Sequence, residues 1–159
     1  MADRIVTILH SGQTGVERGA HHGALATGLP IRGFMRPERR DELGPLPDDI
    51  ACALEPCGDG GQRAAILATL GIATAVVLVV PDIRMAVRKR TSTWVLRGAR
   101  AKSLPYWMCD GATSVTDVAT WYTKLPADEH RILVTGPRAT RWRDGESVAR
   151  RLVKALALV

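Results

Sequence analysis

Residues 5–20 read Ile-Val-Thr-Ile-Leu-His-Ser-Gly-Gln-Thr-Gly-Val-Glu-Arg-Gly-Ala and join two patterns through a short polar turn. The first five residues are apolar or β-branched, which is typical of a buried parallel strand. The last five begin an alanine-rich helix that we expect over residues 16–27, with Gly28 placed to end it. A strand that passes directly into a helix in this way indicates an α/β fold.

The turn between this strand and helix has the composition of an anion site. N–H groups at a helix start point outward, and the helix dipole makes that end positive. Glycines let a ligand approach the backbone, and polar side chains add donors. However, any turn of this kind favours small residues, and the spacing matches neither common phosphate-loop motif. Phosphate binding and an ordinary turn therefore both stay open for Ser11, Gly12, Gln13, Thr14 and Gly15.

Two runs of the sequence resemble the molybdenum-cofactor carrier family. They are Ser-Gly-Gln-Thr-Gly-Val-Glu-Arg at 11–18 and Arg-Arg-Asp-Glu-Leu-Gly-Pro-Leu-Pro at 39–47. That family is related to YpsA and belongs to the Rossmann-like SLOG superfamily, with the lonely-guy phosphoribohydrolases and the DprA DNA-processing proteins. Its usual runs are SGGQTGVDRAAL and GWCPKGRRAEDGxIP, so this chain departs from the family pattern at residues 10–12, 17 and 35–38.

The resemblance implies a fold, a ligand and a set of contacts. The fold is Rossmann-like with the first strand in the middle of the sheet, and the bound ligand is the molybdenum cofactor or a nucleotide. Contacts would come from the first turn, from arginines after the second strand, from a second helix start and from a Gly-Pro-Arg turn after the last strand. These residues are Ser11, Gly12, Gln13, Thr14, Gly15, Arg18, Arg39, Arg40, Thr91, Thr93, Gly136 and Arg138.

Several of these residues also have an ordinary structural explanation. Arg36, Arg39 and Arg40 follow a strand, where ligand loops lie, but they also stand among acids that would form a solvated charge cluster with them. Thr91 or Thr93 can serve as the N-cap of the next helix, because the glycine of the family pattern is missing there. Arg138 is a single arginine at a helix start. For Arg36, Arg39 and Arg40, for the two threonines and for Arg138, a ligand contact and an ordinary structural role therefore both stay open.

Five strand patterns alternate with helical patterns along the chain. We expect strands at 5–9, 29–34, 74–80, 104–108 and 130–135, with the apolar run 75–80 as a central strand buried on both faces. Helices are expected at 16–27, 62–70, 91–102, 114–124 and 144–158, and an irregular segment at 48–61. This alternation predicts an α/β protein, a Rossmann-like three-layer α/β/α sandwich with a mainly parallel sheet of about five strands. The candidate ligand residues then share one edge of the sheet.

Length and composition restrict the class of protein. The chain has 159 residues, of which 46% are hydrophobic and 24% charged, and this fits one ligand-binding domain over residues 1–159. The longest apolar run, residues 73–80, is too short to cross a bilayer, and the residues before Ile5 lack a signal-peptide pattern. We therefore expect a cytoplasmic protein with no membrane partner.

Cysteine and histidine positions do not favour a metal site. The three cysteines, Cys52, Cys57 and Cys109, have no CxxC spacing, so we expect free thiols. His21 and His22 are adjacent and point about 100° apart on a helix, so they cannot share a metal as an i, i+4 pair can. We expect them to be solvated or packed at an edge, and we assign no metal ligand.

The formal charge of +6 comes largely from arginine, which supplies 18 of the 22 basic residues. Arginine binds phosphate through paired hydrogen bonds, in agreement with a phosphorylated ligand, although compositional bias would produce the same excess. A basic surface also suits nucleic acid. Phenylalanine and tyrosine together number three, however, and no DNA-binding motif is present, so we do not expect nucleic acid as a partner.

Three functions follow, in this order. The first is a carrier or sensor that binds a phosphorylated heterocyclic ligand, the molybdenum cofactor or a nucleotide. The second is a nucleoside 5′-monophosphate phosphoribohydrolase, but the PGGxGTxxE run of the lonely-guy relatives is missing, so we assign no catalytic residue and expect no appreciable activity of this kind. The third is a DNA-binding protein related to DprA. Of partners, we expect a small phosphorylated ligand, and a homo-oligomer is compatible with the sequence.

Overall fold

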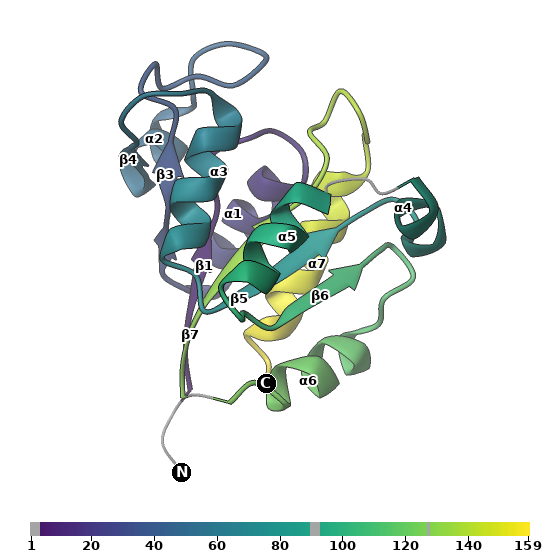
Figure 1. Ribbon diagram of the computed structural model, residues 1–159. Coiled ribbons are helices and arrows are strands. Elements are labelled where there is room, and N and C mark those ends of the chain that lie inside the picture. Colours follow the sequence, from purple (N-terminus) through teal and green to yellow (C-terminus); the bar gives the residue numbers. More distant parts are fainter. Residues whose placement is uncertain (1–3, 90–92, 127) are drawn as a thin grey trace.

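A five-stranded parallel sheet forms the centre of the protein in a computed structural model, which describes residues 4–89, 93–126 and 128–159. The strand order is β2-β1-β7-β5-β6 (Figure 1). These strands are β1 (Ile5–Leu9), β2 (Ile31–Arg32), β5 (Ala75–Val79), β6 (Tyr106–Cys109) and β7 (Glu129–Thr135). In the register of the central pairs, Ile5 lies opposite Glu129 and Ala75 opposite Ile132.

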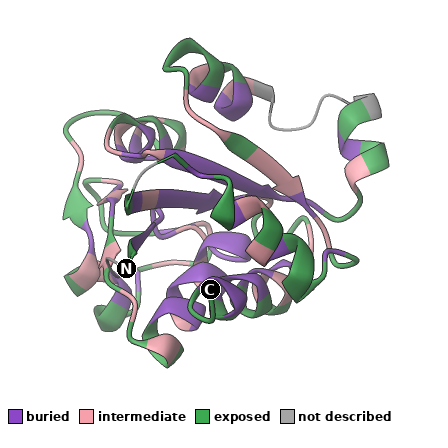
Figure 2. Cartoon of the chain, turned by 90° about the horizontal axis from the view of Figure 1, so that it is seen from below, coloured by how far each residue is buried: buried purple, intermediate pink, exposed green. Residues whose placement is uncertain are grey.

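Helices cover both faces of this sheet and give the molecule three layers. Side chains alternate along β5, so Ala75, Val77 and Val79 pack toward one face and Val76 and Leu78 toward the other. The first face carries α1 (Val16–Thr27), α6 (Val115–Thr123) and α7 (Gly145–Leu156), and the second carries α3 (Gln62–Gly71), α4 (Ile83–Lys89) and α5 (Thr93–Ala101). Figure 2 shows the central strands buried and the outer helix surfaces exposed.

A smaller unit lies beside the main sheet. The strands β3 (Phe34–Met35) and β4 (Glu55–Pro56) pair in parallel, and α2 (Asp48–Ala53) packs on them. Its own apolar cluster consists of Met35, Leu46, Ile50 and Leu54. This unit holds the loop of residues 36–47 next to the turn that follows β1.

The α/β class, the three layers and the parallel five-stranded sheet are confirmed, as are the bounds of β1 and α1 and the αL conformation of Gly28 that ends α1. Ser114 caps α6, and its side chain and that of Asp117 form a capping box. Among the described helices, none combines the length and the apolar character needed to cross a bilayer.

Four details of the expected fold are wrong. The middle strand is β7, whereas β1 lies between β2 and β7. The expected strand 29–34 splits at Gly33, where φ is 148° and a Cβ would overlap the carbonyl oxygen of His10. The segment 48–61 contains α2 and β4, because Pro47 and two aspartates begin a short helix. Residues 83–89, where no element was expected, form α4, and the N–H groups of Arg84 and Met85 there donate to the side chain of Asp82.

Candidate functional site

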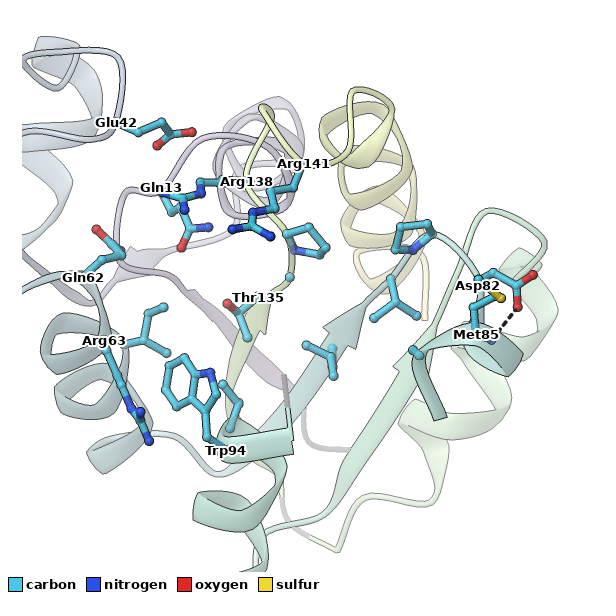
Figure 3. A pocket seen from close by; sticks show the side chains of 18 of the residues that line it. Gln13, Glu42, Gln62, Arg63, Asp82, Met85, Trp94, Thr135, Arg138 and Arg141 are labelled. Atoms are coloured by element: carbon cyan, nitrogen blue, oxygen red, sulfur yellow. Dashed lines mark hydrogen bonds between the residues drawn. The ribbon is translucent and has the colours of Figure 1, made fainter. Parts of the chain in front are cut away.

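A cavity of about 830 Å³ lies at the carboxyl ends of β5 and β7, where open α/β sheets bind ligands (Figure 3). Its walls come from the turn after β1, the loop 36–47, the starts of α3 and α5, α4, and the loop between β7 and α7. The polar and charged residues that line it are Gln13, Arg36, Glu42, Gln62, Arg63, Asp82, Thr135, Arg138 and Arg141. Its apolar lining includes Trp94, Ile66, Leu78, Val80, Met85 and Val95.

In the turn after β1, the N–H groups of Ser11 and Gly12 donate hydrogen bonds to side chains of the protein itself. Ser11 N–H and the Ser11 hydroxyl donate to Glu17 Oε1 at 2.6 and 2.5 Å, and Gly12 N–H donates to His10 Nδ1 at 3.0 Å. Gln62 Nε2 donates to the Ser11 hydroxyl at 2.9 Å. Ser11 and Gly12 therefore stabilise the turn itself, and neither lines the cavity.

Glu17 lies under the cavity and has no exposed surface. Burial of the Glu17 carboxyl group raises its pKa to about 7 and is the largest effect. The hydrogen bonds from Ser11 and from the Thr135 hydroxyl act in the opposite direction and lower the pKa. The Glu42 carboxylate adds a smaller upward shift. When the Gln13 amide is oriented to satisfy both of its groups, it donates to Glu17 Oε2 and accepts from the N–H of Arg138. Glu17 thus connects the turn, β7 and the loop after β7.

Thr14 and Arg18 attach the loop 36–47 to the start of α1. The Thr14 hydroxyl donates to Glu42 and accepts from the N–H of Ala139. Arg18 Nη2 lies 2.6 Å from Asp41 Oδ2, and the Asp41 side chain is 4% exposed. Arg18 is therefore engaged in a buried ion pair, away from the cavity lining.

Gly15 brings the loop after β7 against the start of α1. It has φ 79°, and a Cβ there would lie 2.6 Å from the carbonyl oxygen of Pro137. At Gly136 a Cβ would overlap the carbonyl oxygen of Val79. Both close approaches need glycine, and together they place the loop 136–141 at the cavity.

Of the twelve residues named from the sequence, the cavity lining includes Gln13, Gly136 and Arg138. Arg39 and Arg40 are exposed outside it, and Arg36, from the same loop, lines it instead. Thr91 lies outside the described residues, and Thr93 is the first residue of α5. Sequence reasoning did not name Glu42, Gln62, Arg63, Trp94 or Arg141 as ligand contacts. Of these five residues, only Arg141 lies close in sequence to a recognised motif, the Gly-Pro-Arg turn at residues 136–138.

Two buried histidines connect the turn after β1 to α2. Since His10 Nδ1 accepts from Gly12 N–H, its Nε2 donates to His21 Nδ1 at 3.0 Å, and His21 Nε2 then donates to Asp49 Oδ2 at 3.2 Å. Burial lowers the pKa of His10 to about 3 and also lowers that of His21. The expectation that His21 is solvated or packed at an edge is wrong, because both imidazole rings are buried and the chain of hydrogen bonds reaches the surface only at Asp49.

A protein-family model matches residues 8–157, from β1 to the end of α7, and its description is the circularly permutated YpsA SLOG family. The chain belongs to this SLOG family. The family resemblance noted in the first turn is thereby confirmed. A crystal structure from Syntrophus aciditrophicus, of a protein named as a molybdenum carrier, is similar with a TM-score of 0.79 over 96% of this chain and 95% of the other. The two sequences are 21% identical, so the similarity shows that the two proteins share a fold. Among curated protein sequences, none matches significantly.

Proposed function

We propose that this SLOG protein is a carrier or sensor that binds a phosphorylated heterocyclic ligand in the cavity at the carboxyl ends of β5 and β7. The observation that carries the proposal is a cavity of about 830 Å³ with four arginines in its lining, Arg36, Arg63, Arg138 and Arg141. Cavities of this size hold ligands of nucleotide dimensions. The family and the similar structure named as a molybdenum carrier support a molybdenum cofactor or a nucleotide as that ligand.

The phosphate would bind at the loop between β7 and α7. Among the described residues, neither Arg138 nor Arg141 forms an ion pair, whereas Arg18 is paired with Asp41 and Arg36 with Glu38. Figure 3 shows both side chains beside Gln13 at one side of the cavity. Two unpaired guanidinium groups can each make charge-assisted hydrogen bonds to phosphate oxygens.

The acids near the cavity favour a carrier over a phosphoribohydrolase. Asp82 Oδ1 accepts from the N–H groups of Arg84 and Met85 at the start of α4, at 2.8 and 3.2 Å. Glu42 accepts from Thr14, and Glu17 is enclosed below the cavity by Ser11 and Thr135. Each carboxyl group therefore has a structural partner, which does not suit the mobile acid–base role that cleavage of a glycosidic bond requires.

A thermal-shift panel tests this proposal. It contains GMP, IMP, AMP and 6-hydroxymethylpterin monophosphate, each beside its dephosphorylated form. A phosphorylated ligand at about one hundred times its dissociation constant should stabilise the protein by roughly 2.7 kcal/mol, and the dephosphorylated partner much less. If no phosphorylated compound raises the melting temperature above its partner, the proposal is wrong.

A further inference from the structure

The cavity offers different hydrogen-bonding groups on its two sides. Arg138 and Arg141, on the loop after β7, carry only donors, whereas Glu42, which lies on the other side of Gln13, carries only acceptors (Figure 3). Gln62 lies on the same side as Glu42, and its amide nitrogen already donates to the hydroxyl and the carbonyl of Ser11 at 2.9 and 3.3 Å. The group that Gln62 has left to offer a ligand is therefore its carbonyl oxygen.

Trp94 gives the cavity a flat apolar surface. The guanidinium carbon of Arg63 lies 4.8 Å from the centre of the indole ring and covers one of its faces. Ile66 and Val95 line the cavity beside it. An indole ring held in this way can stack on a planar heterocycle, and such stacking does not depend on which heterocycle is bound. Selection among rings must then come from the polar groups around the ring edge.

From this arrangement we infer that the cavity selects a ring whose edge carries adjacent N–H donors, as guanine does through its ring N–H and 2-amino group. That edge faces Glu42 and the Gln62 oxygen, and the phosphate lies at Arg138 and Arg141. The inference rests on the proposed function, because it specifies the ring of the phosphorylated ligand. A carboxylate can accept from both donors of such an edge at once.

Other common rings fit these acceptors less well. Hypoxanthine keeps the ring N–H but lacks the 2-amino group, so one acceptor loses its donor. Adenine has an amino group beside an unprotonated ring nitrogen, and that nitrogen would face the Glu42 carboxylate lone pair to lone pair. Glu42 and Gln62 are half-buried, and a bound ring would cover them further. Leaving a covered acceptor without a donor costs more than the hydrogen bond itself contributes, which makes the ring edge a strong determinant of specificity.

Calorimetric titration of the full chain with GMP, IMP and AMP tests the inference. GMP should bind about tenfold or more tightly than IMP, because a hydrogen bond to a charged acceptor is lost in IMP. In Glu42→Gln the side-chain amide still accepts from Thr14 but can no longer accept twice, so the ratio between GMP and IMP should fall toward one. Glu55→Gln, on an exposed glutamate of β4, is the matched control and should keep the ratio of the unmodified protein.

The outcomes separate this inference from the proposed function. Equal affinity for GMP and IMP in the unmodified protein would overturn the inference and leave phosphate binding intact. A ratio that persists in Glu42→Gln would also overturn it, since the discrimination would then arise elsewhere. Failure of every phosphorylated ring to bind would overturn both. The comparison of GMP with IMP needs no variant, so it holds even if Glu42→Gln does not fold.

Discussion

Glu17 is a fully buried carboxyl group that accepts hydrogen bonds from neighbouring residues. The N–H and hydroxyl of Ser11 and the hydroxyl of Thr135 all donate to it, and together they fix the turn after β1 against β7. Its burial is nevertheless unfavourable to the charged form, and the pKa is raised to about 7. A buried side chain that bonds Thr135 and Gln13, two residues of the cavity lining, is thus also one that titrates near neutral pH.

The stability of the protein should depend on this titration. Glu17 keeps its proton more tightly in the folded protein than in the unfolded chain, where its pKa is about 4.5, so it destabilises the fold as the pH rises from about 4.5 to about 7. The effect amounts to at most about 3 kcal/mol. His10, whose pKa is lowered to about 3, acts in the opposite direction as the pH falls below 6.5, so the two partly cancel.

Glu17→Gln isolates the glutamate contribution. Glutamine keeps an acceptor for Ser11 and cannot ionise, so the free energy of unfolding of the variant relative to the unmodified protein should increase between pH 4.5 and 7. Urea denaturation at a series of pH values measures it, with Glu55→Gln as the exposed control. A difference that stays constant across this range would show that Glu17 does not titrate there.

At the scale of elements, the packing of α1 on α7 brings two loops together. A Cβ at Gly19 would overlap the carbonyl oxygen of Glu146, and one at Gly23 would lie 2.8 Å from that of Arg150. The backbones of the two helices therefore approach closely, and the turn before α1 meets the loop before α7. The cavity lining takes Gln13 from the turn, and Arg138 and Arg141 from the loop.

Gly19→Ala should separate these helices and destabilise the protein by about 1 to 3 kcal/mol, since the backbone of α7 has to move. Gly71→Ala is the matched control, because no atom lies within 4 Å of a Cβ at that helical position and alanine is the better helix former there. Chemical denaturation measures both variants. Equal stability of Gly19→Ala and Gly71→Ala would contradict the close packing of α1 on α7.

Local patterns in the sequence were sufficient for elements whose formation depends on nearby residues. The apolar run of β1 and the alanines and Gly28 of α1 each lie within one element, and each was predicted correctly. The short helix α2 and the split at Gly33 were missed. They depend on contacts with residues distant in sequence, such as the backbone of His10.

The same limit applies to the candidate site. The sequence indicated that ligand groups gather after strand ends, and Gln13, Gly136 and Arg138 do line the cavity there. Gln62 and Trp94 belong to helix starts on the opposite face of the sheet from α1, and no local pattern shows which side of a helix faces a cavity. Arg39 and Arg36 are three residues apart in one loop, and only the path of the backbone decides which of them reaches the cavity.

For the molecule as a whole, the strand order determines where a ligand can bind. Because β7 lies in the middle of the sheet, beside β1, its following loop packs against the turn after β1 and lines the same cavity as α3, α4 and α5. The cavity lining therefore comes from segments spread between Gln13 and Arg141. This arrangement predicts that the phosphate is bound by Arg138 and Arg141, whereas the family resemblance pointed to Arg18, Arg39 and Arg40 as well as Arg138.

Calorimetric titration with GMP of the unmodified chain and of three variants tests the central claim most directly. The variants are the double substitution of Arg138 and Arg141 by alanine, the double substitution of Arg39 and Arg40 by alanine, and Arg150→Ala on the outer surface of α7. Loss of the first pair should weaken binding by about 1.5 to 3 kcal/mol for each charge-assisted hydrogen bond removed, and the other two variants should bind as the unmodified protein does. Unchanged affinity without Arg138 and Arg141, or a loss confined to the Arg39 and Arg40 variant, would contradict the assignment of this cavity as the phosphate site.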